Sequence, residues 1–303
     1  MTEQTKTFEA GRTEMELLTV FVADQLFGLN IDKVQSIVQY DPKLVTTLPE
    51  KQSGVAGMLL YRNRTIPLMD LSQILDIELE KGFDNEIIVV TEFNKSINSF
   101  KAQGVNRIYR LPWKEFVPLD QLFEDNPFFT GSVNVDDTQV LILDLEHILA
   151  EIFPDVLIEN ISQEILDQNE LLQRGQLDII FAEDSPTMRK AMKKQLQKAG
   201  FENIKAFTNG KQAFDHLVQN YKNHSDETIQ KGVLISDIDM PVMDGLTLCR
   251  QVKSNSDLKN IYVVMFSSLI NDQMIDRCKK IKADNCVSKP EINELIKILD
   301  KRC

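Results

Sequence analysis

The 303-residue chain is poor in the residue types that most often form disulfides or bind transition metals. Its three histidines show no metal-ligand spacing, and its four cysteines include no Cys-x-x-Cys pair. This usage argues against a disulfide framework and favours the reduced thiols of a cytosolic protein. No apolar run approaches the roughly 18 residues of a membrane span, and the polar first residues do not resemble a secretory signal. We therefore expect a cytoplasmic protein with no direct membrane insertion.

Basic residues are scarce in the first part of the chain. The net charge is −12, but residues 1–174 hold 29 acidic and 14 basic residues, whereas residues 175–303 hold 17 acidic and 20 basic ones. Because nucleic-acid backbones are bound through Lys and Arg, the acidic part argues against a nucleic-acid partner and favours protein partners. The length suits two domains, each large enough for a core of its own.

The first 155 residues contain short stretches of alternating polar and apolar residues separated by turn residues. The expected strand pairs are 17–23 with 26–31, 57–61 with 65–71, 86–93 with 97–102, and 132–135 with 139–145. Short helical signals interrupt them at 32–38, 72–75 and 146–151. Regular short strands with polar turns are typical of small barrels or sandwiches, so we predict an all-β domain over residues 1–155.

A different pattern begins near Pro154. Residues 156–175 place apolar residues at roughly helical spacing among acids and amides, which predicts a helical linker that docks on one domain. From residue 176 to residue 303, short apolar strands alternate with helical segments. Five strands and five helices in this order predict a doubly wound α/β domain with a five-stranded parallel sheet of flavodoxin-like size.

Polar side chains follow four of these predicted strands. The first strand ends at Glu183-Asp184, the third at Asp237, the fourth at Ser267 and the fifth at Lys289. In this topology the four strands are neighbours, so their carboxyl ends converge. Clustered carboxylates favour Mg²⁺, and a lysine and a hydroxyl can bind phosphoryl oxygens. Taken singly, these residues could be helix caps or surface charges, but together they predict phosphoryl transfer to Asp237 as the nucleophile.

These residues resemble the motifs of the response-regulator receiver domain of two-component systems. The matching positions are Glu183-Asp184, Asp237, Met240-Pro241, Asp244-Gly245, Ser267 and Lys289-Pro290. The resemblance implies that Asp237 accepts a phosphoryl group from a histidine kinase, assisted by Lys289 and Ser267. It also implies Mg²⁺ bound by Asp184, Asp237 and the backbone carbonyl of Asp239, with Glu183 acting directly or through water.

One position departs from that family. Receivers usually carry Tyr or Phe three residues before the lysine, where rotation of the ring reports phosphorylation, and this chain has Cys286 there. The phosphoryl chemistry does not need that ring. The departure therefore affects only the way in which phosphorylation is reported to the rest of the protein. We take Ser267 and Cys286 as the two switch positions.

The β-rich region resembles the CheW family of chemotaxis coupling proteins. The resemblance is carried by residues 17–23 and 27–31, the expected helix containing Val34 and Ile37, and residues 54–62, 65–71 and 141–145. The order of coupling domain and receiver is that of the CheV proteins. This implies two intertwined five-stranded SH3-like barrels that bind chemoreceptor tips and a CheA-type histidine kinase. Arg62, Val34, Ile37 and Val38 are the candidate partner contacts, although the three apolar residues could equally be barrel core.

The N-terminal region shows no set of catalytic residues, since it has one histidine, His147, and no cysteine. We therefore expect a non-enzymatic cytoplasmic adaptor at chemoreceptor arrays that couples receptors to the kinase and is tuned by phosphorylation of Asp237. In one alternative, the receiver is a phosphate sink for the kinase. In another, the N-terminal region is an unrecognised output enzyme.

Overall fold

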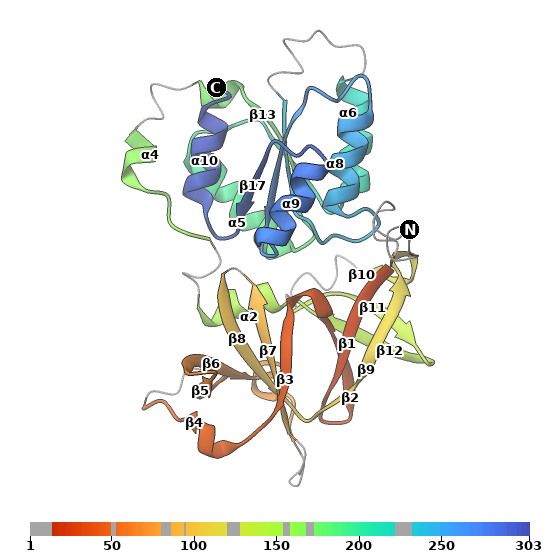
Figure 1. Ribbon diagram of the computed structural model, residues 1–303, viewed down its shortest axis with the longest axis vertical. Coiled ribbons are helices and arrows are strands. Elements are labelled where there is room, and N and C mark those ends of the chain that lie inside the picture. The colour runs from red at the N-terminus through yellow and green to blue at the C-terminus, as the bar shows by residue number, and fades with distance from the viewer. Residues whose placement is uncertain are drawn as a thin grey trace. The chain divides into compact units, whose positions relative to one another are not determined.

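The computed structural model describes residues 14–49, 53–79, 86–93, 95–119, 128–153, 158–167, 173–221 and 232–303. They form two compact units, one within residues 14–154 and one within residues 155–303. The first unit is built mainly of strands and the second of alternating strands and helices (Figure 1). The predicted fold class, an all-β region followed by a parallel α/β domain, is confirmed.

The N-terminal unit contains two six-stranded sheets, with the orders β10-β11-β12-β2-β1-β9 and β3-β7-β8-β6-β5-β4. The strands of the first are β1 (Glu14–Val22), β2 (Gln25–Asn30), β9 (Gly104–Pro112), β10 (Val117–Pro118), β11 (Phe129–Val135) and β12 (Thr138–Leu143). Those of the second are β3 (Val34–Gln39), β4 (Val45–Thr46), β5 (Val55–Tyr61), β6 (Arg64–Asp70), β7 (Ile87–Phe93) and β8 (Ser96–Ala102). The chain builds the whole second sheet between β2 and β9, so the two sheets are interwoven.

Strand β7 of this unit is buried on both faces. In β7, Ile87 and Val89 belong to a core that includes strands of both sheets and helix α2 (Leu145–Ile152). Ile88 and Val90 belong to a separate core within the second sheet. Successive side chains of a strand point to opposite faces, so an unbroken apolar run fits a strand between two cores.

Several segments of this unit differ from the sequence prediction, among them the short strands β4 and β10. The prediction of a helix at residues 32–38 is wrong. A 3-10 turn at Ile31–Lys33 leads directly into strand β3. The β-branched residues Val34, Ile37 and Val38 favour a strand, and β3 pairs antiparallel with β7. Strand β9 was not predicted; none of its residues is buried, as suits an edge strand that pairs with β1. The helical signals at 72–75 and 146–151 correspond to α1 (Leu71–Ile74) and α2.

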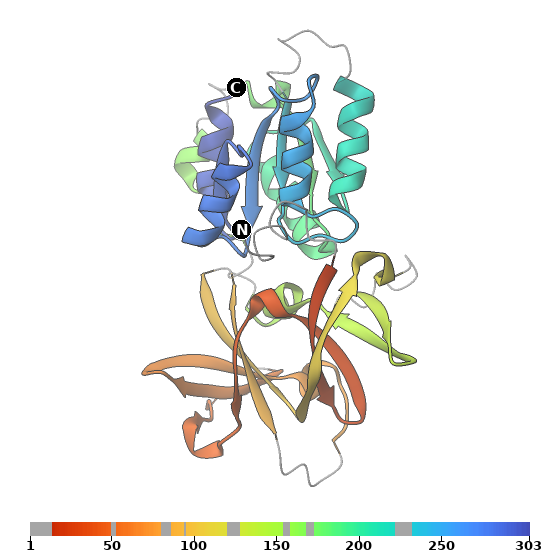
Figure 2. The ribbon, with the colours of Figure 1, turned by 45° about the vertical axis from the view of Figure 1, so that its right-hand side comes forward.

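The C-terminal unit is a parallel sheet with the strand order β14-β13-β15-β16-β17. Its strands are β13 (Asp178–Ala182), β14 (Ile204–Phe207), β15 (Gly232–Ser236), β16 (Tyr262–Ser267) and β17 (Asn285–Ser288). The main helices are α5 (Pro186–Lys198), α6 (Gly210–Tyr221), α8 (Gly245–Ser254), α9 (Asp272–Lys280) and α10 (Ile292–Asp300). Helices cover both sides of the sheet (Figure 2). One core contains residues of α5 and α10, and the other contains residues of α6, α8 and α9.

Side-chain caps fix where several of these helices begin. The Ser185 hydroxyl accepts a hydrogen bond from the backbone N–H of Met188 at the start of α5, where Pro186 occupies the first turn. Asp244 caps α8 in the same way through the N–H of Thr247. Such caps satisfy N–H groups that have no partner within the helix. They also fix where the loops that carry the site residues end, at the carboxyl edge of the sheet.

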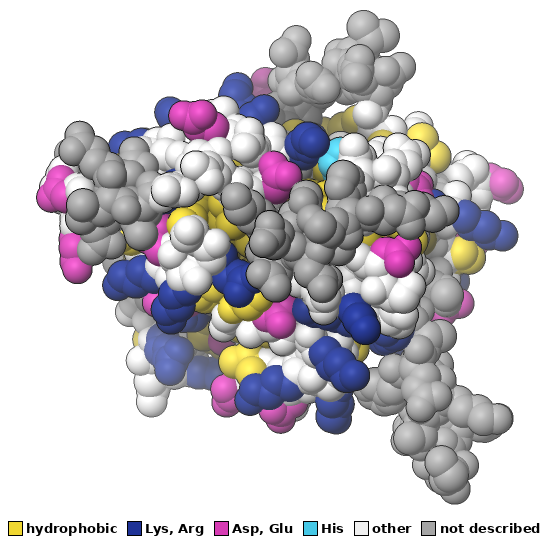
Figure 3. All heavy atoms as spheres, turned by 90° about the horizontal axis from the view of Figure 1, so that it is seen from above, with side chains coloured by type: hydrophobic (Ala, Val, Ile, Leu, Met, Phe, Trp, Pro, Cys, Tyr) yellow, Lys and Arg dark blue, Asp and Glu magenta, His cyan; other side chains and the backbone are white. Residues whose placement is uncertain are grey.

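The segment between the two domains is only partly helical where it is described. Residues 163–167 form helix α4 (Gln163–Asp167), residues 158–162 are irregular, and a 3-10 turn covers Arg174–Gln176. The rest of the predicted linker lies outside the described residues. On the face of the molecule shown in Figure 3, acidic and basic side chains are interspersed, with small apolar areas between them.

Candidate functional site

The backbone brings four site residues to one edge of the parallel sheet. Glu183, Asp237 and Lys289 each follow directly on the last residue of a strand, and Ser267 is the last residue of β16. The sheet ladder continues one residue further: Asp237 donates its N–H to the carbonyl of Ala182 at 2.9 Å, and Lys289 donates to the carbonyl of Ser267 at 3.1 Å. Side chains that are distant in sequence are thus held at the carboxyl ends of adjacent strands, where doubly wound sheets place their binding sites.

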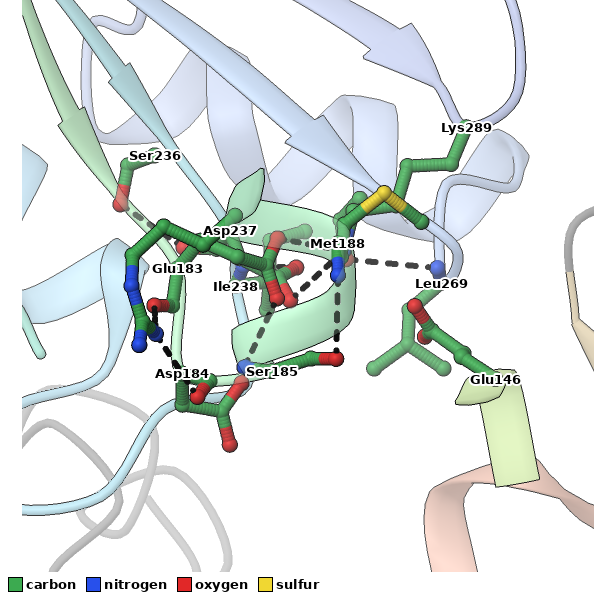
Figure 4. Close-up of polar contacts among 12 residues, drawn as sticks. Glu146, Glu183, Asp184, Ser185, Met188, Ser236, Asp237, Ile238, Leu269 and Lys289 are labelled. Atoms are coloured by element: carbon green, nitrogen blue, oxygen red, sulfur yellow. Dashed lines mark hydrogen bonds and ion pairs between the residues drawn. The ribbon is translucent and has the colours of Figure 1, made fainter. Parts of the chain in front are cut away.

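A buried lysine joins the two carboxylates of the site. The Nζ atom of Lys289 lies 2.8 Å from Oε2 of Glu183 and 3.0 Å from Oδ2 of Asp237, and Lys289 is fully buried (Figure 4). A buried charge needs partners of the opposite sign, because removing it from water is costly. The two ion pairs therefore position the ammonium group beside Asp237.

The second oxygen of Asp237 is fixed by the backbone. Its Oδ1 atom accepts a hydrogen bond from the N–H of Ile238 at 2.6 Å (Figure 4). Asp237 as a whole is only 5% exposed, so most of its surface is screened from solvent. A carboxylate held by a lysine on one oxygen and an amide on the other has a defined orientation, which a nucleophile in phosphoryl transfer requires.

Three carboxylates form the candidate metal centre. One oxygen each of Glu183, Asp184 and Asp237 lie within 4.8 Å of one another, with Asp184 half-buried and the other two buried. Hard carboxylate oxygens in a partly open site suit Mg²⁺, which keeps several waters and bridges carboxylates to phosphates. The residues present therefore fit the predicted Mg²⁺ site. The role of the Asp239 carbonyl stays a prediction.

The loop that carries Asp237 depends on a close approach of two backbone segments. A Cβ atom added to Gly245 would lie 1.8 Å from the carbonyl oxygen of Asp237, and the Gly245 N–H donates to the carbonyl of Ile238 at 2.8 Å. The Ser236 hydroxyl donates to the same Asp237 carbonyl at 2.8 Å. Only glycine fits at position 245, which explains the Asp-Gly dipeptide seen in the sequence.

Arg189 is a site residue that the sequence analysis missed. It lies on α5, and its Nη1 atom donates to the carbonyls of Glu183 at 2.8 Å and Asp184 at 3.0 Å. These bonds fix the backbone of the acidic pair. An arginine in the first helical turn after an acidic pair is the only signal in the sequence, and it does not distinguish this role from a surface charge.

The two switch candidates lie on adjacent strands. Ser267 is buried, and its hydroxyl accepts a hydrogen bond from the N–H of Leu269 at 3.4 Å. Cys286 lies in β17, is half-buried, and packs against the core on the side of α9. A hydrogen bond with Cys278 of α9 lowers the pKa of Cys286. The same hydrogen bond, together with burial, raises the pKa of Cys278. Where receivers usually have an aromatic ring, this chain has a pair of thiols.

The partner-contact candidates of the N-terminal unit lie in different environments. Arg62 is exposed in the turn between β5 and β6, with its guanidinium group 5.0 Å from the centre of the Tyr61 ring. Ile37 is 41% exposed, whereas Val34 and Val38 are half-buried and pack against two different cores. Arg62 and Ile37 are thus the candidates that a partner could reach directly.

Together, the sheet order and the acidic site with its lysine define a receiver domain, here joined to a β-rich domain of two interwoven sheets. The family model of the CheW-like domain matches residues 16–153, and that of the response regulator receiver domain matches residues 179–300. Chemotaxis protein CheV3 of Helicobacter pylori is 30% identical over 289 residues, which cover 91% of this chain and 89% of that protein. Chemotaxis protein CheV1 of the same organism is 27% identical over 291 residues, covering 90% and 88%. The chain belongs to the CheV family of chemotaxis proteins.

Among the described residues, none of the helices has the length and apolar character needed to cross a membrane.

Proposed function

We propose that this protein is a chemotaxis adaptor that couples chemoreceptors to a CheA-type histidine kinase, and that phosphorylation of Asp237 tunes this coupling. The observation that carries the proposal is the contact between Lys289 and Asp237 at the edge of a receiver sheet, in a chain that also has a CheW-like domain. We further propose that it does not act as an enzyme on other substrates and that it works in the cytoplasm at receptor arrays.

In the proposed reaction, a carboxylate oxygen of Asp237 attacks the phosphorus atom of a phosphohistidine on the kinase. The new P–O bond forms as the P–N bond to the histidine breaks, and the imidazole leaves with the electron pair. Mg²⁺ held by Glu183, Asp184 and Asp237 would neutralise phosphoryl oxygens when it is bound.

The chain's own side chains supply the remaining stabilisation. The ammonium group of Lys289 already lies 3.0 Å from Asp237, so a short displacement of this residue brings it into contact with an incoming phosphoryl oxygen. Ser267 lies at the end of the neighbouring strand, where its hydroxyl can donate to another oxygen. The Ile238 N–H keeps the Asp237 carboxylate oriented during attack.

The proposal is tested by transfer of labelled phosphate from a phosphorylated CheA-type kinase to the full chain. We expect transfer with Mg²⁺, loss of transfer after chelation by EDTA, and no transfer to the Asp237→Asn variant. Absence of transfer to the wild-type chain would refute the receiver function. Binding to receptor and kinase is then measured with and without phosphorylation. Identical binding, combined with rapid loss of phosphate, would favour the phosphate-sink alternative over tuning.

A further inference from the structure

The segment that precedes the receiver domain is packed along the last helix of that domain. We call this segment, residues 158–167, the strap. Ile158, Ile161 and Ile165 of the strap are 7%, 6% and 1% exposed, and they belong to the same core as Leu295 and Leu299 of α10. Figures 1 and 2 both show α4, the helical end of the strap, beside α10. The strap is therefore part of the receiver unit rather than a free linker.

One end of the strap is bound to the loop that carries the site lysine. The N–H of Glu159 donates to the carbonyl of Pro290 at 3.1 Å, and Pro290 follows Lys289 directly. Lys289 in turn contacts Asp237 through its side chain. The path from the strap to the phosphoacceptor therefore runs through two adjacent residues and one ion pair.

A single asparagine of α10 holds the same end of the strap. The Asn293 Oδ1 atom accepts a hydrogen bond from the N–H of Ser162 at 2.9 Å. Its Nδ2 atom donates to the carbonyl of Asn160 at 3.0 Å and to Oε2 of Glu159 at 3.1 Å. One side-chain amide thus binds three groups of the strap in the first turn of α10, next to the lysine loop.

The other end of the strap is anchored in a different way. Arg174 is fully buried, and its Nη1 atom donates to the carbonyls of Ile165 at 3.0 Å and Ala199 at 2.8 Å. The same guanidinium group forms two bonds with the Asp300 carboxylate, of 2.7 and 2.8 Å. A bidentate pair formed by a buried arginine is strong and geometrically specific. This end is a fixed anchor at the last residue of α10.

The two ends therefore differ in how easily they open. The Arg174 end depends on a buried ion pair, whereas the hydrogen bonds of Asn293 at the Pro290 end are accessible to solvent. Opening of this end breaks exposed hydrogen bonds and uncovers two apolar side chains, Ile158 and Ile161, so it needs a local change and not unfolding of the domain. The end that can open is the end that contacts the lysine loop.

We propose that the first half of the strap, residues 158–162, is the element that reads the phosphorylation state of Asp237. The inference rests on the proposed function. A phosphoryl group on Asp237 draws Lys289 from its present contacts with Glu183 and Asp237 towards the new oxygens. This shifts the adjoining Pro290 carbonyl, the acceptor for Glu159, and releases the strap from Pro290 and Asn293 while Arg174 holds the other end. The strap follows the coupling domain in the chain, so its release changes the tether of that domain.

Hydrogen–deuterium exchange of the full chain tests the strap, with Mg²⁺ and beryllofluoride as the phosphoryl mimic. We expect exchange at the amides of Glu159 and Ser162 to rise by about fivefold or more, the effect of losing one hydrogen bond. The amide of Leu177, next to the Arg174 anchor, serves as the reference and stays unchanged. The amide of Ile238, which donates to Asp237, reports whether the mimic is bound.

The two proposals fail in different ways in this experiment. A changed Ile238 amide with an unchanged strap would refute the strap as the readout and leave the receiver function standing. An unchanged Ile238 amide, together with no phosphoryl transfer to Asp237, would refute the proposed function itself.

A pair of asparagine variants separates signalling from simple packing. Asn293→Ala removes three hydrogen bonds to the strap, so we expect fast exchange at Glu159 and Ser162 already without the mimic, and little further rise when it is added. Asn203→Ala is the matched control, because Asn203 is exposed and donates one side-chain hydrogen bond to the Gly175 carbonyl, away from the lysine loop. This control keeps the wild-type response. A full response to beryllofluoride in Asn293→Ala would contradict the proposal.

Discussion

The two units of this protein differ in how many large apolar side chains they expose and in whether they bury charged side chains completely. Among the described residues, seven of the eight most exposed large apolar side chains lie in the N-terminal unit: Ile37, Leu44, Leu48, Leu60, Val105, Ile108 and Val117. The receiver unit instead buries its charges completely at Lys289, Glu183 and Arg174. Exposed apolar side chains suit contacts with other proteins, whereas buried and paired charges suit chemistry or internal anchoring. This difference supports the proposal that the first unit binds partners and the second carries the phosphoryl chemistry.

The largest expected effect is a complete loss of phosphoryl transfer with no loss of partner binding. Asp237→Asn removes the nucleophilic carboxylate, so we expect phosphoryl transfer to be abolished while binding of the unphosphorylated protein to receptor and kinase is retained. Transfer is measured with a phosphorylated kinase, and binding by titration calorimetry. Asp215→Asn, a change of the same type on the exposed side of α6, should leave both unchanged. Transfer to Asp237→Asn at the wild-type rate would mean that the acceptor lies elsewhere.

The second expected effect is on the stability of the receiver unit alone. Gly245→Ala places a methyl group 1.8 Å from the Asp237 carbonyl oxygen, so we expect a loss of about 3 kcal/mol or more in the free energy of unfolding. Gly175→Ala is the control, because its added Cβ would meet only the Glu202 side chain, at 3.4 Å.

The single tryptophan allows the loss of stability in Gly245→Ala to be assigned to one of the two units. Trp113 lies in the N-terminal unit, so its fluorescence reports that unit during urea unfolding, while circular dichroism at helical wavelengths is dominated by the receiver unit. We expect Gly245→Ala to shift the dichroism transition more than the fluorescence transition. Equal shifts of both signals would show that the two units unfold as one.

Local chemistry was easier to predict from the sequence than long-range packing. Each site residue of the receiver sits next to its own strand, so Glu183, Asp237 and Lys289 could be placed together once the strand order was inferred. Strand β3 was mistaken for a helix, because short apolar runs fit both periods and only its pairing with β7 decides. The ion pair of Arg174 with Asp300 joins residues 126 positions apart, so no local sequence pattern predicts it.

A smaller effect is expected at the surface of the N-terminal unit. Arg62→Ala removes an exposed guanidinium group from the β5–β6 turn, so we expect about tenfold weaker binding of a partner protein. Phosphorylation of Asp237 should not change. Arg64→Ala, two residues along in β6 and also exposed, is the matched control. Equal losses for both variants would indicate a general charge effect rather than a contact of Arg62.

The smallest effect concerns the thiols, which all lie in the receiver unit and so report on it alone. Burial raises the pKa of Cys249 to about 12, whereas the hydrogen bond with Cys278 lowers the pKa of Cys286. Only the thiolate reacts with iodoacetamide, so near neutral pH we expect Cys286 to be alkylated several-fold faster than Cys249. Site-resolved mass spectrometry at several pH values measures the two rates.

The sign of the pH dependence sharpens this last test. A lowered pKa means that Cys286 becomes a thiolate at lower pH in the folded protein than in the unfolded chain, so its labelling saturates at lower pH in the native state. The Cys278→Ala variant removes the hydrogen bond and should move the labelling profile of Cys286 to higher pH. An unshifted profile would show that Cys278 does not set the acidity of Cys286. The thiol pair would then be ordinary core packing, and position 286 would have lost the reporting role that the aromatic ring has in other receivers.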